Sequence, residues 1–200
     1  MLDVDLQMVP CGQPKVGQIQ TIAGTPTLVL RIPTICQELT HICDINWNHD
    51  QTNSVQKLKR RLVVAFDRPL QFPGTPDLPP HIFLLSRGSR DPNSGRTCWC
   101  EVEGKTRLVR LKDRCKAKSD FDVASPGIPP NAILFEGDLE PGNADISGLY
   151  RVVLKCDLLA DEKGRAPDGN HLPPWFNTPN YTTGDGVAGG EFYSWFELQP

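Results

Sequence analysis

Residues 148–155, with the sequence GLYRVVLK, alternate in polarity and run directly into an acidic turn region. In an extended chain successive side chains point to opposite faces, so Tyr150, Val152 and Leu154 would share one face. Aspartate, asparagine and glycine between residues 161 and 170 then interrupt the pattern, as turn residues do. This segment predicts a long β-strand that ends in a turn, which restricts the chain to folds built on sheets.

Other short apolar or alternating runs, separated by turns, occupy much of the remaining sequence. They lie at residues 27–32, 39–47, 61–67, 81–86, 97–103, 106–111, 132–136 and 191–198. Nineteen prolines and seventeen glycines favour short strands over long helices. We therefore expect an all-β fold, an antiparallel β-sandwich with long irregular loops and little helix.

Local signals refine this arrangement. Gly104-Lys105 predicts a tight turn that joins 97–103 and 106–111 in a hairpin. Residues 1–38 are predicted to form an N-terminal arm and the first strand. Residues 39–200 are predicted to form the sandwich with a C-terminal extension, together one structural unit.

The last run, 191–198, has two contrasting faces. Phe192, Phe196 and Leu198 occupy even positions, whereas Tyr193 and Trp195 share the odd face with two glutamates. The odd face is therefore expected to be exposed to solvent or to cover a partner.

Charge and cysteine content limit the classes of partner. The net charge of the 200 residues is −3, which gives no basic footprint for nucleic acid. No apolar run approaches the ~20 residues of a membrane span. The N-terminus has acids where a secretory signal has basic and then apolar residues. Seven cysteines without a CxxC pair favour reduced thiols. We expect a cytoplasmic protein or a component of a particle assembled without a leader.

Several polar clusters are candidate metal sites. The acidic turn offers oxygen ligands for calcium, although its spacing matches no known calcium loop and an ordinary turn is the simpler interpretation. The residues concerned are Asp157, Asp161, Glu162, Asp168 and Asn170. We expect no cofactor, with calcium as the alternative.

Histidine and cysteine pairs offer two further metal hypotheses. His41 and Cys43 share a strand face near His49, which would allow a zinc site completed from elsewhere. Cys98 and Cys100 would also share a face, where reduced cysteines pack in the core or contribute to a metal site. In both cases ordinary packing is the simpler interpretation.

Aromatic residues in loops suggest a different ligand. Trp175 and Tyr181 follow no strand pattern, and their flat rings could stack on sugars. Motifs of enzymes are missing: there is no GxSxG, no GxxxxGK[ST], no GxGxxG after a strand and no HExxH. We therefore expect a protein that is not an enzyme.

Four segments carry a family resemblance. Leu62–Pro69 ends in the pattern F-[SD]-x-P, and Ile82–Leu85 contains an F-x-L element. Tyr150–Leu154 reads Y-x-V-x-L, and an expanded D-x-x-G-x-x-L turn begins at Asp161. Over about residues 40–172 the chain resembles a bacterial Ig-like domain of surface-layer and cell-envelope proteins. The chain differs from the family pattern in its insertions at 71–80, 87–96 and 112–131 and in its C-terminal tail.

The resemblance implies an adhesive, spacer or scaffold role without catalytic residues. We accordingly expect a structural or adaptor subunit that contacts protein partners or copies of itself in a larger assembly, with strand addition at a sheet edge as the mode of contact. The alternative is a module that binds carbohydrate or another surface ligand.

Overall fold

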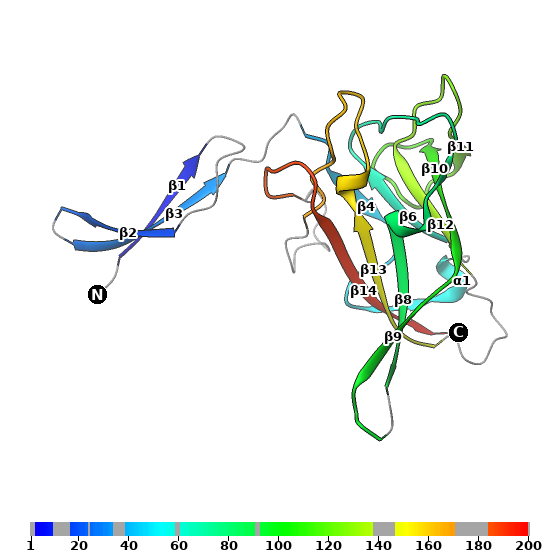
Figure 1. Ribbon diagram of the computed structural model, residues 1–200, viewed down its shortest axis with the longest axis horizontal. Helices are drawn as coiled ribbons and strands as arrows, with labels where there is room; N and C mark the ends of the chain where they lie inside the picture. The colour runs from blue at the N-terminus through cyan, green and yellow to red at the C-terminus, as the bar shows by residue number, and fades with distance from the viewer. Residues whose placement is uncertain are drawn as a thin grey trace.

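The computed structural model describes residues 3–9, 17–23, 25–33, 39–58, 61–90, 93–137, 147–170 and 184–199. These residues form three β-sheets (Figure 1). The first sheet contains β1 (Asp3–Val9), β2 (Gly17–Ile22) and β3 (Thr25–Pro33) in the order β1-β3-β2, with β1 parallel to β3. Only the third of these strands was predicted, because residues 1–26 were interpreted as a polar arm interrupted by glycines and prolines. β1 nevertheless alternates polar and apolar residues, which is the pattern of a strand.

The other two sheets form a β-sandwich. The six-stranded sheet has the order β11 (Phe121–Val123), β10 (Gly104–Leu111), β12 (Ala132–Gly137), β6 (Arg61–Phe66) and β4 (Ile42–Ile45), and β7 (Asp77–Leu78) also pairs with β10. The five-stranded sheet has the order β5 (Thr52–Ser54), β14 (Glu191–Gln199), β13 (Gly148–Lys155), β8 (Phe83–Arg90) and β9 (Thr97–Glu101).

Helical structure in the described residues is limited to three short elements. These are the helix α1 (Val55–Leu58) and two 3₁₀ turns, η1 (Pro80–Ile82) and η2 (Cys156–Leu158). None of the described helices has the length and apolar character needed to cross a membrane. The predicted all-β sandwich with little helix is confirmed.

The core lies between the two sheets of the sandwich. Tyr150 of β13 and Phe196 of β14 are almost fully buried and stack with ring centroids 5.7 Å apart. Phe83 of β8 stacks on Phe135 of β12 across the interior, with centroids 5.0 Å apart. The strand predicted at 148–155 is thus central, and its Tyr150 face points inward as its alternation indicated.

The predicted hairpin between 97–103 and 106–111 is wrong. β9 pairs with β8, whereas β10 pairs with β12 in the other sheet, so the chain crosses between sheets at Gly104. A Cβ atom on Gly104 would lie 2.3 Å from Cζ of Phe135. This glycine is therefore required by close approach to a core ring, not by a tight turn.

The outer face of the six-stranded sheet is covered by the chain itself. Residues 112–120 lie over it, and Ala117 packs with Val63, Leu134 and their neighbours in a second apolar cluster. A disulfide joins Cys43 of β4 to Cys115 with a Cα–Cα distance of 5.5 Å, and Oδ2 of Asp44 accepts the Ala117 N–H at 2.7 Å. The expectation of reduced thiols is wrong for this pair, because the fold brings together two cysteines 72 residues apart in sequence.

Candidate binding face

The outer face of the five-stranded sheet carries exposed aromatic and apolar side chains. We call this surface the open face and define it by Leu84, Trp99, Leu149, Arg151, Tyr193 and Trp195. In β8, β13 and β14 these residues alternate with core residues, whereas all five residues of β9 are exposed. Trp99, Leu149 and Tyr193 are 37%, 41% and 40% exposed. The prediction that Trp195 shares an outward face with Tyr193 is confirmed.

One half of the open face is organised by a glycine. Gly88 of β8 pairs with Trp99 of β9, and a Cβ atom on Gly88 would lie 3.3 Å from Cζ3 of the indole, so the ring lies over the glycine. The guanidinium of Arg151 sits over the same ring, 4.5 Å from its centroid. Nε of Arg151 is buried and has no hydrogen-bond partner among the described residues. The ring therefore holds a cation in place on an exposed surface.

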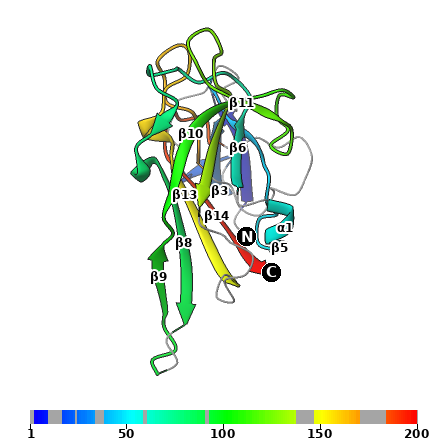
Figure 2. The same cartoon turned by 90° about the vertical axis from the view of Figure 1, so that its right-hand side faces the viewer.

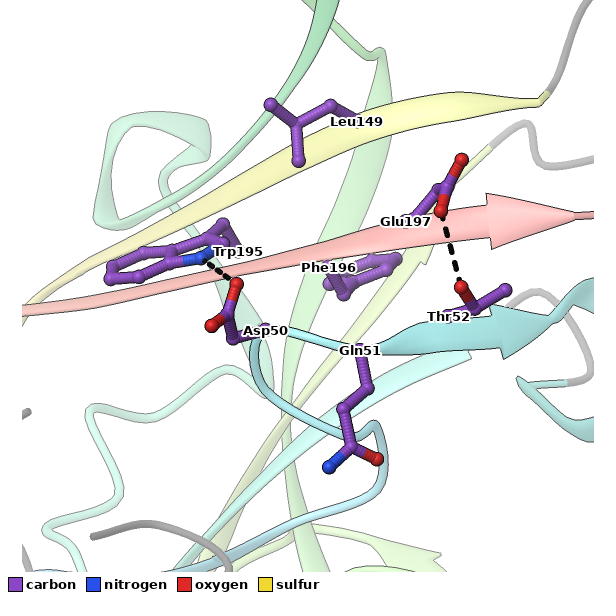
Figure 3. A pocket seen from close by; sticks show the side chains of 7 residues that line it. All are labelled: Asp50, Gln51, Thr52, Leu149, Trp195, Phe196 and Glu197. Atoms are coloured by element: carbon purple, nitrogen blue, oxygen red, sulfur yellow. Dashed lines mark hydrogen bonds between the residues drawn. The ribbon is translucent and has the colours of Figure 1, made fainter. Parts of the chain in front are cut away.

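The other half of the open face borders a groove of about 270 Å³ beside Trp195 (Figure 3). Its lining comes from β13, β14, β5 and the turn before β5, namely Asp50, Gln51, Thr52, Leu149, Trp195, Phe196 and Glu197. The indole Nε1–H of Trp195 donates to Oδ1 of Asp50 at 2.7 Å, and the hydroxyl of Thr52 donates to Oε2 of Glu197 at 3.1 Å. The groove thus combines one aromatic ring with carboxylate, hydroxyl and amide groups.

A buried polar chain supports Trp195 from behind. Oγ of Ser194 accepts the Nε1–H of Trp47 at 2.8 Å and lies 3.0 Å from Nδ1 of His49. The His49 ring meets Trp195 edge to face, with centroids 4.3 Å apart. Burial lowers the pKa of His49, although the nearby Asp50 charge opposes this effect.

The contact between Ser194 and His49 has the residue types of a catalytic pair but not the accessibility. Ser194 is 0% exposed, and its oxygen already accepts the Trp47 N–H. A substrate carbonyl cannot reach this oxygen without opening the core. The chain of contacts therefore anchors the turn before β5 to β14.

Charged groups lie around the open face. The Tyr193 hydroxyl donates to Oε2 of Glu191, and this bond raises the pKa of Tyr193. Glu197 lies toward one end of β14, and Lys155 of β13 is the backbone register partner of Glu191 at the other end. An aromatic centre with a charged rim is the composition found at protein–protein interfaces.

The acidic residues considered for calcium are dispersed, and several of their carboxylates accept peptide N–H groups. Oδ1 of Asp161 accepts the N–H groups of Lys163 and Arg165 at 2.8 and 2.9 Å. Burial acts to raise the pKa of Asp161, but these two bonds and the Arg165 charge outweigh it, so the pKa is lowered. This is the geometry of a turn closed by an aspartate, with Gly164 in the left-handed region.

Asp168 and Asp157 hold the loop that leads into β14. Asp168 is 0% exposed and accepts the N–H groups of Asp185 and Gly186 at 3.2 and 2.7 Å. Burial raises its pKa despite these bonds. Oδ1 of Asp157 accepts the N–H of Gly190 at 2.9 Å.

The two remaining calcium candidates lie near the same loops. Glu162 is exposed in the Asp161 turn. The Asn170 side chain lies where a Cβ on Gly190 would be, its Oδ1 1.9 Å from that position. Within the described ranges, no three His, Cys, Asp or Glu side chains gather as a metal site.

The structure also corrects the two metal-site hypotheses that were based on histidine and cysteine. Cys43 is in a disulfide, so the proposed zinc site with His41 and His49 loses its thiolate. Cys98 and Cys100 share a strand face as expected, but both are exposed, and the expectation that they lie in the core is wrong. The reason is that β9 is an edge strand at the end of its sheet.

Trp175 and Tyr181, the predicted sugar-binding residues, lie outside the described residues. Only part of the open face could be predicted from the sequence. Strand alternation indicated Trp195 and Tyr193, whereas the contact of Trp99 with Arg151 depends on β8 lying between β9 and β13. The order of strands in a sheet cannot be predicted from the residue pattern of a single segment.

Comparisons with known proteins give little further information. No protein-family model matches the chain, and no curated protein matches its sequence. Among solved structures, the fold is similar to that of PcoC, a methionine-rich copper resistance protein from Escherichia coli. The TM-score is 0.39 at 9% identity, over 80% of this chain and 99% of that chain. A similarity of this size carries no conclusion about function.

Proposed function

We propose that this protein is a non-catalytic structural or adaptor subunit that binds a partner protein through its open face. The supporting observation is the difference between its two outer faces. One is covered by residues 112–120 and fixed by the Cys43–Cys115 disulfide, while the other leaves three large side chains more than one third exposed. Clustered exposed apolar side chains with a polar rim mark interaction surfaces.

The side chains of the open face also indicate which groups the partner presents. Trp99, Leu149 and Tyr193 require an apolar complement, since aromatic side chains supply most of the binding energy at interfaces. The guanidinium of Arg151, held over Trp99 on the open face, favours a carboxylate on the partner. The proposed partner therefore presents an apolar patch with an acidic side chain within it.

Replacement of Leu149 by serine tests this proposal. We expect the variant to recover at least ~30-fold less of the partner than the unchanged chain in quantitative affinity capture from the producing cells, which is the loss expected for a hot-spot residue of an interface. Leu158→Ser is the matched control, because Leu158 is a leucine of similar exposure, 50%, located in η2 and not on the open face. Equal recovery by the two variants would contradict the proposal.

A second candidate function is carbohydrate binding in the groove beside Trp195. The supporting observation is that the lining combines an indole with the side chains of Asp50, Thr52 and Glu197, which can hydrogen-bond sugar hydroxyls. Binding on a glycan array that disappears with Trp195→Ala and persists with Trp99→Ala would support this function. Absence of binding to any glycan would remove it.

The proposal also covers the Ig-like role of the protein and the cellular compartment in which it matures. The F-[SD]-x-P pattern has a local role here, since Oδ1 of Asp67 accepts the N–H of His41 at 2.7 Å where β6 ends. We assign the chain to an adhesive or scaffold role of the Ig-like kind. The Cys43–Cys115 disulfide supports maturation in an oxidising compartment, in place of the cytoplasm expected from the sequence.

A further inference from the structure

β9 is an unusual edge strand, because it is exposed along its whole length. All five of its residues are exposed, and it stands at the end of the five-stranded sheet. No other strand in the described part of the chain pairs with its far side. Figures 1 and 2 both show the β8–β9 hairpin extending beyond the rest of the sandwich. Such an edge is a template for another strand.

The hydrogen-bonding direction of each β9 residue follows from its register with β8. The N–H of Val102 donates to the carbonyl of Leu85 at 2.8 Å, and Cys100 pairs with Arg87 in the same register. In an antiparallel ladder the peptide groups of alternate residues point to the same side. Cys98 and Cys100 therefore direct their peptide groups toward β8, whereas the peptide groups of Thr97, Trp99 and Glu101 point to the open edge.

The two thiols of β9 are placed symmetrically. Cys98 and Cys100 are both free and exposed, and they lie on one face of the strand on either side of Trp99. An antiparallel strand added about a two-fold axis at Trp99 would bring Cys98 opposite Cys100 of a second copy, and Cys100 opposite Cys98. All five residues of each strand would then pair.

We infer that β9 is a self-association edge that pairs antiparallel with β9 of a second copy of this chain, joined by two disulfides between Cys98 and Cys100. At the open edge these two positions form a non-hydrogen-bonded pair, where Cα atoms are ~4.5 Å apart. This distance falls within the ~4.4–6.8 Å that a disulfide spans. A register shifted by two residues matches only one thiol of each copy.

Polar residues fit the same register. Thr97 lies opposite Glu101 of the second copy, so a hydroxyl faces each carboxylate and no two carboxylates are directly opposed. The pairing also places the open faces of the two copies side by side on one continuous sheet. The inference goes beyond the proposed function, since it depends on the strand edge and the thiols and not on a partner protein.

Each disulfide requires an oxidant, for which glutathione disulfide serves. The Cys98 thiolate attacks one sulfur of glutathione disulfide, giving a mixed disulfide and one glutathione. The Cys100 thiolate of the second copy then attacks the Cys98 sulfur and releases the second glutathione. Two protein thiols lose two electrons and two protons, and one glutathione disulfide becomes two glutathione molecules.

Single variants make the register testable on the full chain. In the proposed pairing, Cys98→Ser alone places a serine opposite each remaining cysteine, and so does Cys100→Ser alone. Neither variant should form a covalent dimer with glutathione disulfide, measured by non-reducing electrophoresis. An equimolar mixture of the two variants should form one, because Cys100 of the first then faces Cys98 of the second.

Isotope labelling identifies the disulfide between Cys98 and Cys100 of two different copies. Trypsin releases residues 97–105 as one peptide with both cysteines, and a mixture of ¹⁴N and ¹⁵N unchanged chains should yield a mixed-label disulfide-linked pair of this peptide. The double variant Cys98→Ser/Cys100→Ser is the control and should form no covalent dimer under the same oxidation, as measured by non-reducing electrophoresis. Cross-linking of either single variant alone, failure of the mixture to cross-link, an internal Cys98–Cys100 bond in a monomer, or a covalent dimer of the double variant would overturn the inference.

Discussion

At the scale of single residues, the loop before β14 depends on a glycine that fits against a buried carboxylate. Gly184 has a φ of +120°, and a Cβ atom there would lie 2.4 Å from Oδ2 of Asp168. Asp168 cannot move aside without losing its bond to the Gly186 N–H. We expect Gly184→Ala to lower the free energy of unfolding by ~2–4 kcal/mol, from backbone strain together with a disturbed buried carboxylate.

A second glycine with positive φ serves as the control that distinguishes the clash with Asp168 from the backbone strain. Gly127 also has a positive φ, +89°, but a Cβ atom there would meet nothing within 4 Å. Gly127→Ala should therefore lose only the backbone contribution, ~1–2 kcal/mol. Urea unfolding followed by tryptophan fluorescence measures both variants, and equal losses would refute the role of the Asp168 contact.

His49 gives the sandwich a defined pH dependence. Burial lowers the pKa of His49 in the folded protein, while in the unfolded chain it titrates near its ordinary value of about 6.5. As the pH falls below this value the unfolded state binds the proton first, so the stability contributed by neutral His49 is complete above pH 6.5 and is lost as the pH decreases toward the folded-state pKa. His49→Asn keeps an acceptor for Ser194 but cannot titrate.

The test compares urea unfolding of the unchanged chain and the asparagine variant at pH 7.5 and pH 5.5. The unchanged chain should lose more stability between these two values than the variant does. Other titrating groups contribute equally to both proteins, so the difference belongs to His49. An identical loss in the two proteins would show that the histidine is not held neutral by its buried position.

At the scale of elements, the Cys43–Cys115 disulfide closes a loop of 72 residues around β6, β8, β9 and β10. Chain-entropy arguments assign ~4 kcal/mol to a cross-link of this length. Replacing both cysteines by alanine should reduce the free energy of unfolding by about that amount in guanidinium titrations. The double replacement of Cys98 and Cys100 by serine, measured on monomeric protein, should leave it almost unchanged because these thiols are free.

Elements were predictable from the sequence where one strand carries its own pattern. β13 and β14 alternate so regularly that their inward faces were predicted, as were the boundaries of β13 and, to within one residue, those of β14. Gly104 was misinterpreted, because the same glycine serves a tight turn or a close approach to a ring, and only the position of Phe135 distinguishes the two. The disulfide and the contact of Trp99 with Arg151 depend on which strands become neighbours, and local alternation does not encode that order.

At the scale of the whole molecule, the described members of the buried apolar clusters all lie after position 41. Every member of the two clusters lies between Ile42 and Leu198, and β1, β2 and β3 pair only with one another among the described strands. We therefore predict that the sandwich folds without the first 38 residues. The free energy of its unfolding should change by less than ~1 kcal/mol when they are deleted, since none of the described cluster members is removed.

Tryptophan fluorescence follows the unfolding of the sandwich and not that of the N-terminal sheet. The four tryptophans are at positions 47, 99, 175 and 195, so the N-terminal sheet contributes none. Trp47 is 2% exposed and bonded to Ser194, and its emission should shift to the red in one cooperative transition as the core opens. The shortened and full chains should give the same urea midpoint and the same slope. A lower midpoint for the shortened chain would show that the N-terminal sheet contributes to the stability of the sandwich.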